Sequence, residues 1–160
     1  MRALIDTNVA LDVILERQPW LEDSKGVWDA CHEMKIVGHL VATSLTNLFY
    51  VSRRITGTDK ARAGVRMCLA TFEVLPVGRF ELEQADAKAG GDLEDNVSMA
   101  CAKVAGLDAI VTRDPRGFAG STIPVLSPAQ LLALLSKDKP SDTDTIPSQT
   151  KPPIDDEPGI

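Results

Sequence analysis

The chain has 160 residues with a net charge of −6, and 44% of its residues are hydrophobic and 25% charged. This length and composition predict one globular domain, and the negative charge argues against a basic protein that coats nucleic acid, although an enzyme with a local basic patch and an acidic site stays possible. No apolar run reaches the ~18–20 residues that a membrane span needs, and the N-terminus lacks the features of a signal peptide, so we expect a cytoplasmic protein.

Strand-like and helix-like segments alternate from residue 2 to residue 135. A short apolar run opens the chain, and an acid and a stretch with apolar residues at helical intervals follow it. In chain order, the expected strands are residues 2–5, 40–43, 72–75, 108–112 and 123–126. The expected helices are residues 9–17, 19–34, 45–56, 59–70, 79–88, 93–104 and 129–135.

Several of these helices carry start signals. Ser44 and Thr58 directly precede two of them, and Ser127-Pro128 starts the last one, with the serine as its cap and the proline in its first turn. A hydroxyl at that position can accept a hydrogen bond from a free backbone amide, and proline suits the first helical turn. Because helices separate the strands, we expect an α/β fold in which a central parallel sheet of four to five strands lies between two layers of helices.

The composition changes after residue 135. Residues 136–160 read SKDKPSDTDTIPSQTKPPIDDEPGI and hold five of the ten prolines but almost no large apolar residues. Such a segment cannot bury enough surface to offset the entropy lost on ordering. The expected organisation is therefore one domain over residues 1–135 and a disordered, acidic, proline-rich tail over residues 136–160.

Acidic residues follow the strands at one predicted edge of the sheet. Asp6 comes directly after the first strand, and Asp114 comes shortly after the fourth. Asp92, Glu94 and Asp95 begin the helix that leads into that fourth strand. Ligands of parallel α/β sheets bind beyond the carboxyl ends of the strands, so three distant segments should place their acids at one rim.

Carboxylates gathered in this way repel one another, by about 1 kcal/mol at ~4 Å in water and by several times more in a less polar environment. A divalent cation relieves the repulsion, and oxygen ligands of this kind suit Mg²⁺ or Mn²⁺. Such an ion can activate water and stabilise charge on a phosphoryl group, which predicts a hydrolytic nuclease.

Each acid taken alone also fits a structural role. Asp6 could cap the first helix, Asp92 or Asp95 could complement a helix dipole, and Asp114 before a proline could belong to a turn. Spacing by itself leaves both interpretations open. The position of all these acids at strand ends of one small sheet is what favours the metal site.

The motifs around these acids resemble those of PIN domains. Leu4–Val9 (LIDTNV) is similar to the opening of the family, and Asp92–Ala102 (DLEDNVSMACA) resembles its second acidic block. Asp108–Phe118 (DAIVTRDPRGF) resembles its closing Thr-x-Asp-x-x-Phe motif, and Val125–Leu132 (VLSPAQLL) fits its last strand and helix. The resemblance covers roughly residues 1 to 135 and keeps the order of the motifs. It is closest to members of the VapC type with an Asp-x-Glu-Asp block.

The resemblance implies a PIN-like nuclease domain that cleaves RNA with Mg²⁺ or Mn²⁺. The metal-binding acids carried over by position are Asp6, Asp95, Asp114, Asp92 and Glu94. The catalytic set is Asp6, Asp95, Asp114 and the hydroxyl of Thr112. The polar or basic groups expected around the metal or on the substrate are Asn8, Asn47, Arg113 and Arg116. The resemblance also implies a toxin of a toxin–antitoxin pair, with RNA as substrate, a small antitoxin as partner and a homodimer as assembly.

Two positions depart from the family pattern. Members usually carry a glutamate in the helix after the second strand, where this chain has Asn47, and an acid before the final phenylalanine, where it has Gly117. Both changes remove negative charge, which Asp92 or Glu94 could replace. They favour an alternative in which the protein is a catalytically weak or inactive PIN-fold module that binds RNA or a partner.

Basic residues near the predicted site could bind the phosphates of RNA. Arg113 and Arg116 flank Asp114 and are expected to contact the phosphate that is cleaved. A second basic group could bind phosphates or could form an ordinary solvated helix surface; it consists of Arg53, Arg54, Lys60, Arg62 and Arg66. A phosphoaspartyl enzyme or receiver domain with Asp6 as nucleophile is a third hypothesis, but it lacks the second acid and the lysine of such sites.

Overall fold

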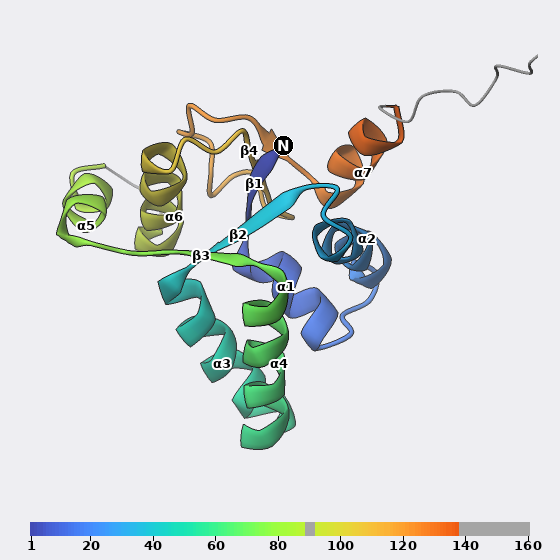
Figure 1. Ribbon diagram of the computed structural model, residues 1–160. Coiled ribbons are helices and arrows are strands. Elements are labelled where there is room, and N and C mark those ends of the chain that lie inside the picture. Colours follow the sequence, from blue (N-terminus) through green and yellow to red (C-terminus); the bar gives the residue numbers. More distant parts are fainter. Residues whose placement is uncertain (89–91, 138–160) are drawn as a thin grey trace, which may run out of the picture.

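The computed structural model describes residues 1–88 and 92–137 (Figure 1). All pairings within its five-stranded sheet are parallel, and the strand order is β3-β2-β1-β4-β5. The strands are β1 Arg2–Ile5, β2 Val37–Val41, β3 Glu73–Leu75, β4 Ala109–Val111 and β5 Val125–Leu126. The helices are α1 Thr7–Ile14, α2 Leu21–His32, α3 Ala42–Thr56, α4 Thr58–Thr71, α5 Arg79–Asp86, α6 Leu93–Val104 and α7 Pro128–Lys137.

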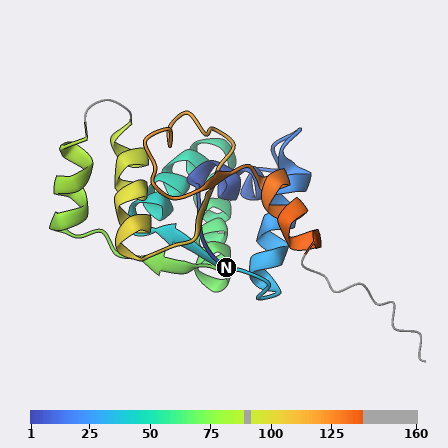
Figure 2. The ribbon, with the colours of Figure 1, turned by 90° about the horizontal axis from the view of Figure 1, so that it is seen from above.

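Helices cover both faces of this sheet. Side chains alternate between the faces of a strand, and in β1 Ala3 and Ile5 join a cluster with α1, α2 and α7, while Leu4 joins a second cluster with α5 and α6. Viewed from above, α5 and α6 lie to one side of the strands and α2 and α7 to the other (Figure 2). The predicted α/β class, its three layers and its parallel sheet are therefore confirmed.

The central position of β1 determines where the functional residues can lie. β1 pairs with β2 on one side and with β4 on the other, both in parallel. Ile5 is opposite Val111, so the residues that follow β1 and β4 emerge together at one edge of the sheet. That edge also receives the N-termini of α1 and α6, which begin at Thr7 and Leu93.

The first strand and the helix Leu93–Val104 have the predicted bounds, whereas the second strand does not. β2 begins at Val37, and Gly38 in it packs so closely that a Cβ would lie 2.6 Å from Sγ of Cys31 and 2.8 Å from Cδ1 of Phe72. Glycine is unfavourable in the interior of a strand, so the predicted strand began at residue 40 instead of Val37. The other elements occur where predicted, with shifted ends.

Two predicted helix caps are wrong and one is confirmed. Ser44 lies inside α3, which begins directly after Val41, and Thr58 is the first residue of α4 rather than its cap. The N-cap residues of these two helices are Val41 and Gly57, which have no polar side-chain atom to accept a hydrogen bond, so no side-chain cap is formed. At α7 the Ser127 hydroxyl accepts from the amide of Gln130 at 3.2 Å, and the Gln130 side chain accepts from the amide of Ser127 at 2.8 Å.

The structure bears on the predicted domain boundary and on the expectation that no segment crosses a membrane. α7 extends to Lys137, two residues past the predicted boundary at 135, and the rest of the predicted tail, residues 138–160, lies outside the described residues. Within the part of the chain that the structure describes, no helix is both long enough and apolar enough to cross a bilayer.

Candidate active site

Two of the predicted side chains lie at the ends of neighbouring strands. The backbone amide of Asp6 donates to the carbonyl of Val111 at 2.9 Å, so the pairing of β1 with β4 continues one residue beyond the strands. Asp6 and Thr112 therefore emerge side by side. The hydroxyl of Thr112 donates to Oδ2 of Asp6 at 2.6 Å and fixes the direction of that carboxylate.

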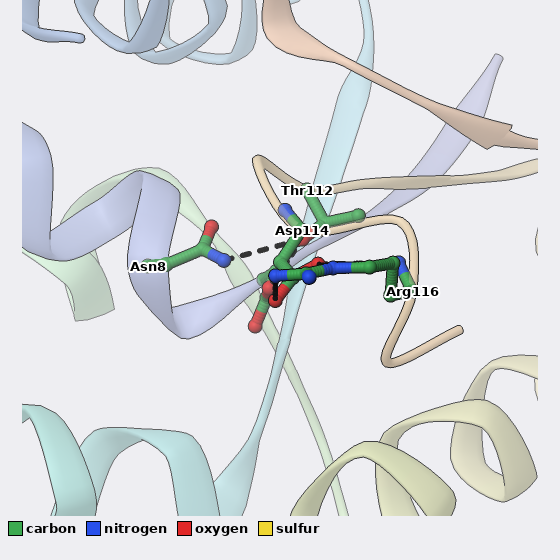
Figure 3. A network of polar contacts seen from close by, with 5 residues as sticks. Asn8, Thr112, Asp114 and Arg116 are labelled. Carbon is green, nitrogen blue, oxygen red and sulfur yellow. Dashed lines mark hydrogen bonds and ion pairs between the residues drawn. The ribbon is translucent and has the colours of Figure 1, made fainter. Parts of the chain in front are cut away.

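The Thr112 hydroxyl is the centre of a small polar network (Figure 3). It accepts from Nδ2 of Asn8 at 3.2 Å and from the backbone amide of Asp114 at 3.0 Å. A hydroxyl has one proton to donate and two lone pairs, so its capacity is fully used here. This arrangement suits a group that orients Asp6 and the turn into Asp114, and a direct catalytic part for Thr112 stays a prediction.

The N-terminus of α6 adds the second acidic block. Oδ1 of Asp92 caps the helix by accepting from the amide of Glu94 at 2.8 Å. The Glu94 carboxylate then joins three helices, because it accepts from the Thr7 hydroxyl of α1 at 3.2 Å and from Nδ2 of Asn47 of α3 at 2.7 Å. The position of the missing helix glutamate is therefore occupied by an amide donor, and the negative charge next to it comes from Glu94.

Asp6 is a strongly perturbed acid. Burial raises its pKa from 3.8 to about 6, although the hydrogen bond from Thr112 opposes this. The charges of Asp95 and Glu94 contribute to this rise, and Glu94 also raises the pKa of Asp95, so all three carboxylates lie within electrostatic reach of one another. Burial and like charge both disfavour the ionised form, so this group of acids would be stabilised by a cation.

Asp95 shares this environment and is in close contact with the closing motif. Burial raises its pKa, and the charges of Asp92, Glu94 and Asp114 add to the effect. A Cβ built at Gly117 would lie 2.2 Å from Oδ2 of Asp95. Gly117 therefore leaves room for the Asp95 carboxylate, and an acid at this position, as the family pattern usually has, would require Asp95 to move.

The two predicted arginines lie in different environments. Arg116 is 90% exposed, and its Nε lies 3.1 Å from Oδ1 of Asp114, whose pKa the hydrogen bonds from Arg116 lower. Arg113 instead points back into the fold, where Nε lies 2.7 Å from Oδ2 of Asp12. The Asp114 carboxylate is thus already paired, although in an exposed position where such a pair is weak and easily exchanged.

The structure brings most of the predicted residues to one edge and shows others that the sequence analysis missed. Direct hydrogen bonds connect Asp6, Asn8, Thr112 and the backbone of Asp114, and a second set connects Thr7, Asn47, Glu94 and the cap residue Asp92. Asp95 joins them through its electrostatic coupling. The contributions of Thr7 and Asp12 were not predicted, although an acid within the apolar run around Asp12 was a visible signal.

The donor chemistry of this edge fits a small divalent cation. Its candidate ligands are carboxylate oxygens, and among the described residues no cationic side chain pairs with Asp6, Glu94 or Asp95. In residues 1–88 and 92–137, no three His, Cys, Asp or Glu side chains lie close enough to enclose an ion by themselves. Mg²⁺ commonly binds through one or two carboxylates and keeps several waters, so the residues present are compatible with it.

The fold and the site together define an α/β domain with an acidic site at the carboxyl edge of a parallel sheet. The PIN domain family model matches residues 2–116, so the chain belongs to the PIN domain family. This confirms the family predicted from the motifs. Comparison with curated protein sequences gives no match.

Several solved structures share the fold at low sequence identity. VapC20 of Mycobacterium tuberculosis, described as a sarcin-ricin loop cleaving toxin, is 17% identical with a TM-score of 0.63 over 74% of this chain and 94% of that chain. A toxin–antitoxin complex from Klebsiella pneumoniae is 22% identical, with a TM-score of 0.60 over 79% and 97%. DNA-bound VapBC from Salmonella typhimurium is 17% identical, with a TM-score of 0.62 over 80% and 98%. These likenesses establish the fold.

Proposed function

We propose that the protein is a metal-dependent endoribonuclease that uses Mg²⁺ or Mn²⁺. The observation that carries this proposal is the Asp6 carboxylate, which is half-buried, lies within electrostatic reach of two other acids and has no cationic partner among the described residues. A divalent ion held there would activate water and stabilise negative charge on the phosphoryl group. Family membership and the cleavage activity named for VapC20 support this choice of reaction and substrate.

The side chains of this site have distinct roles in the proposal. Asp6 and Asp95 would hold the ion, and Asp114 would join them after exchanging its ion pair with Arg116. Thr112 orients Asp6 through its donated hydrogen bond. The guanidinium of Arg116, once released, lies at an exposed position where it can bind a phosphate of the RNA strand.

Glu94 and its neighbours form the other side of the proposed site. The amide of Asn47 and the hydroxyl of Thr7 hold both oxygens of Glu94, so this carboxylate is oriented before any ion binds. Asp92 is occupied in capping α6. We propose that Glu94 supplies the charge that the family usually places on α3, through a direct bond or through the water shell of the ion.

Cleavage assays with matched variants test the proposed function. Purified protein and a mixed RNA pool are incubated with Mn²⁺ or with EDTA, beside Asp95→Asn and the exposed control Asp86→Asn. We expect cutting that requires Mn²⁺, survives in the control and falls at least about tenfold in Asp95→Asn. Cutting that continues in EDTA, or that is equal in all three proteins, would rule out the proposed metal site.

A second candidate function rests on the pairing of Asp114 with Arg116. If that ion pair persists, the closing motif offers no free carboxylate, and the protein would be a weakly active or inactive module that binds RNA or a partner. RNA binding without cutting in the same assay would support it. The phosphoaspartyl hypothesis has lost its basis, because the chain belongs to the PIN family.

We also propose a small antitoxin as partner. The solved relatives include toxin–antitoxin complexes, and some are bound to DNA. Co-expression with the product of an adjacent short reading frame, followed by purification of a complex that no longer cuts RNA, would test this. The homodimer and the cytoplasmic location stay predictions.

Gly117 gives a prediction for the geometry of Asp95. Gly117→Ala is expected to leave the fold intact but to displace the Asp95 carboxylate, because its Cβ would lie 2.2 Å from Oδ2 of Asp95. We expect the affinity for Mn²⁺ in calorimetry to fall by about tenfold. Gly78→Ala is the control, since its Cβ would also meet a carboxylate oxygen, 2.9 Å away on Glu81. Equal affinities in both variants would mean that Asp95 does not bind the ion.

A further inference from the structure

A buried ion pair lies behind the candidate site. Asp12 of α1 has a fully buried side chain, and its Oδ2 lies 2.7 Å from Nε of Arg113, whose side chain is 20% exposed. The same oxygen accepts a hydrogen bond from the hydroxyl of Ser24 on α2 at 3.1 Å. A buried carboxylate is costly unless it is paired, so Asp12 and Arg113 each depend on the other.

The guanidinium of Arg113 is held on a second side as well. Its Cζ lies 4.1 Å from the centroid of the Trp20 ring, which attracts a cation to its face. The backbone amide of Arg113 donates to Oδ1 of Asn8 at 3.3 Å. The side chain and the main chain of Arg113 are therefore both anchored to the segment that contains α1 and the start of α2.

The place of Arg113 in the chain makes this anchoring important for the site. Arg113 lies between Thr112, which orients Asp6, and Asp114. An arginine that is free to move beside carboxylates forms bidentate ion pairs with them. Arg116, the other arginine of this loop, has no such anchor, and its guanidinium lies on Asp114.

We propose that Asp12 is a positioning residue of the acidic site, and that it acts by holding the guanidinium of Arg113 against Trp20 and away from the carboxylates that would bind the ion. The inference rests on the proposed function for the role of those carboxylates. Without Asp12, Arg113 would compete with the ion for them, and the site would be blocked by its own loop.

The test combines metal binding with a signal that needs no metal. The variants are Asp12→Asn, which keeps the size of the side chain, Arg113→Met, and the double variant Asp12→Asn/Arg113→Met. Asp29→Asn is the control, because it breaks an exposed ion pair with Lys25 elsewhere on the surface. Protein labelled with 5-fluorotryptophan gives one fluorine NMR signal from each tryptophan, and a Trp28→Phe variant identifies the signal of Trp20.

We expect the Trp20 signal of metal-free Asp12→Asn to move to the position found in Arg113→Met, because the guanidinium leaves the ring in both. Mn²⁺ affinity in Asp12→Asn should fall by about tenfold. The double variant should regain the affinity of the wild type, because no arginine is left to compete. Asp29→Asn should match the wild type in both measurements.

Two results would overturn the inference. One is an unmoved Trp20 signal with unchanged Mn²⁺ affinity in Asp12→Asn. The other is a double variant that binds Mn²⁺ as weakly as Asp12→Asn, since the loss would then come from a loosened loop rather than from the released charge. If the wild type itself binds no Mn²⁺, the proposed function fails, whereas the Trp20 signal still decides whether Asp12 holds the guanidinium.

Discussion

Replacing Asp6 by asparagine is expected to remove most of the metal-dependent RNA cleavage and, at the same time, to stabilise the metal-free protein above neutral pH. A metal that stabilises charge in a transition state contributes several kcal/mol, which corresponds to about a hundredfold to a thousandfold in rate. Asp6→Asn should lose activity on this scale, because it removes the carboxylate of the proposed ligand set that is coupled to both Asp95 and Glu94.

The gain in stability follows from the pKa of Asp6. Burial raises that pKa from 3.8 to about 6 in the folded protein, so the folded state binds the proton more tightly than the unfolded chain. The contribution of this carboxyl to stability is therefore fully present below pH 3.8 and is lost as the pH rises through about 6. Asparagine stays neutral throughout and avoids the loss, which amounts to at most about 3 kcal/mol at ~1.36 kcal/mol per pKa unit.

Thermal unfolding in EDTA between pH 4 and pH 8 measures this effect. The advantage of Asp6→Asn over the wild type should grow across that range and become constant above about pH 7. The control variant Asp86→Asn should show no such growth. Added Mn²⁺ should raise the melting temperature of the wild type and not that of Asp6→Asn, because only the wild type binds the ion. A stability advantage of Asp6→Asn that is independent of pH would mean that ionisation of Asp6 does not destabilise the folded protein.

The site residues that follow β1 and β4 could be predicted from sequence because their positions depend on local patterns. Alternation of strands and helices determines a parallel sheet, and the rule for ligand sites in such sheets then directs attention to Asp6 and to the segment that contains Thr112 and Asp114. Their proximity follows from the pairing of β1 with β4. Neither step needs knowledge of a side-chain contact.

The contribution of Asn47 could not be predicted in the same way. In the sequence it stands for a missing charge, and the simplest expectation is a weaker site. In the structure its amide donates to Glu94 across 47 positions of sequence, from α3 to the start of α6. Only this contact between α3 and the start of α6 shows that the acid has been replaced by a donor for another acid. The same applies to Gly117, whose lack of a side chain makes room for Asp95.

Arg113 and Arg116 show the limit of sequence reasoning for charged residues. Both flank Asp114, and the sequence offers no reason to expect different environments for their side chains. Arg113 is partly buried between Asp12 and Trp20, and Arg116 lies on the surface with Asp114. The difference depends on a carboxylate more than a hundred positions away in the chain. A substrate contact through the Arg113 guanidinium would require that buried pair to open, so Arg116 is the better placed of the two to meet a phosphate.

Truncation of Asp12 to alanine is expected to have the largest effect on stability. Removing one partner of a buried ion pair typically costs 3–5 kcal/mol, whereas replacing both by apolar residues costs little or is stabilising. Asp12→Ala should therefore lower the free energy of unfolding by about 4 kcal/mol, and Asp12→Ala/Arg113→Met should recover much of that loss. Asp29→Ala, in an exposed pair with Lys25, should change it by less than about 1 kcal/mol.

Urea unfolding of the four proteins, followed by circular dichroism, measures these differences. The recovery in the double variant matters most, because a simple cavity at position 12 would make both variants containing Asp12→Ala equally unstable. Burial raises the pKa of Asp12, and the Arg113 guanidinium offsets only part of this effect. A double variant no more stable than Asp12→Ala would mean that Asp12 does not compensate the charge of Arg113. The loop that carries Asp114 would then be anchored by Trp20 and Asn8 instead.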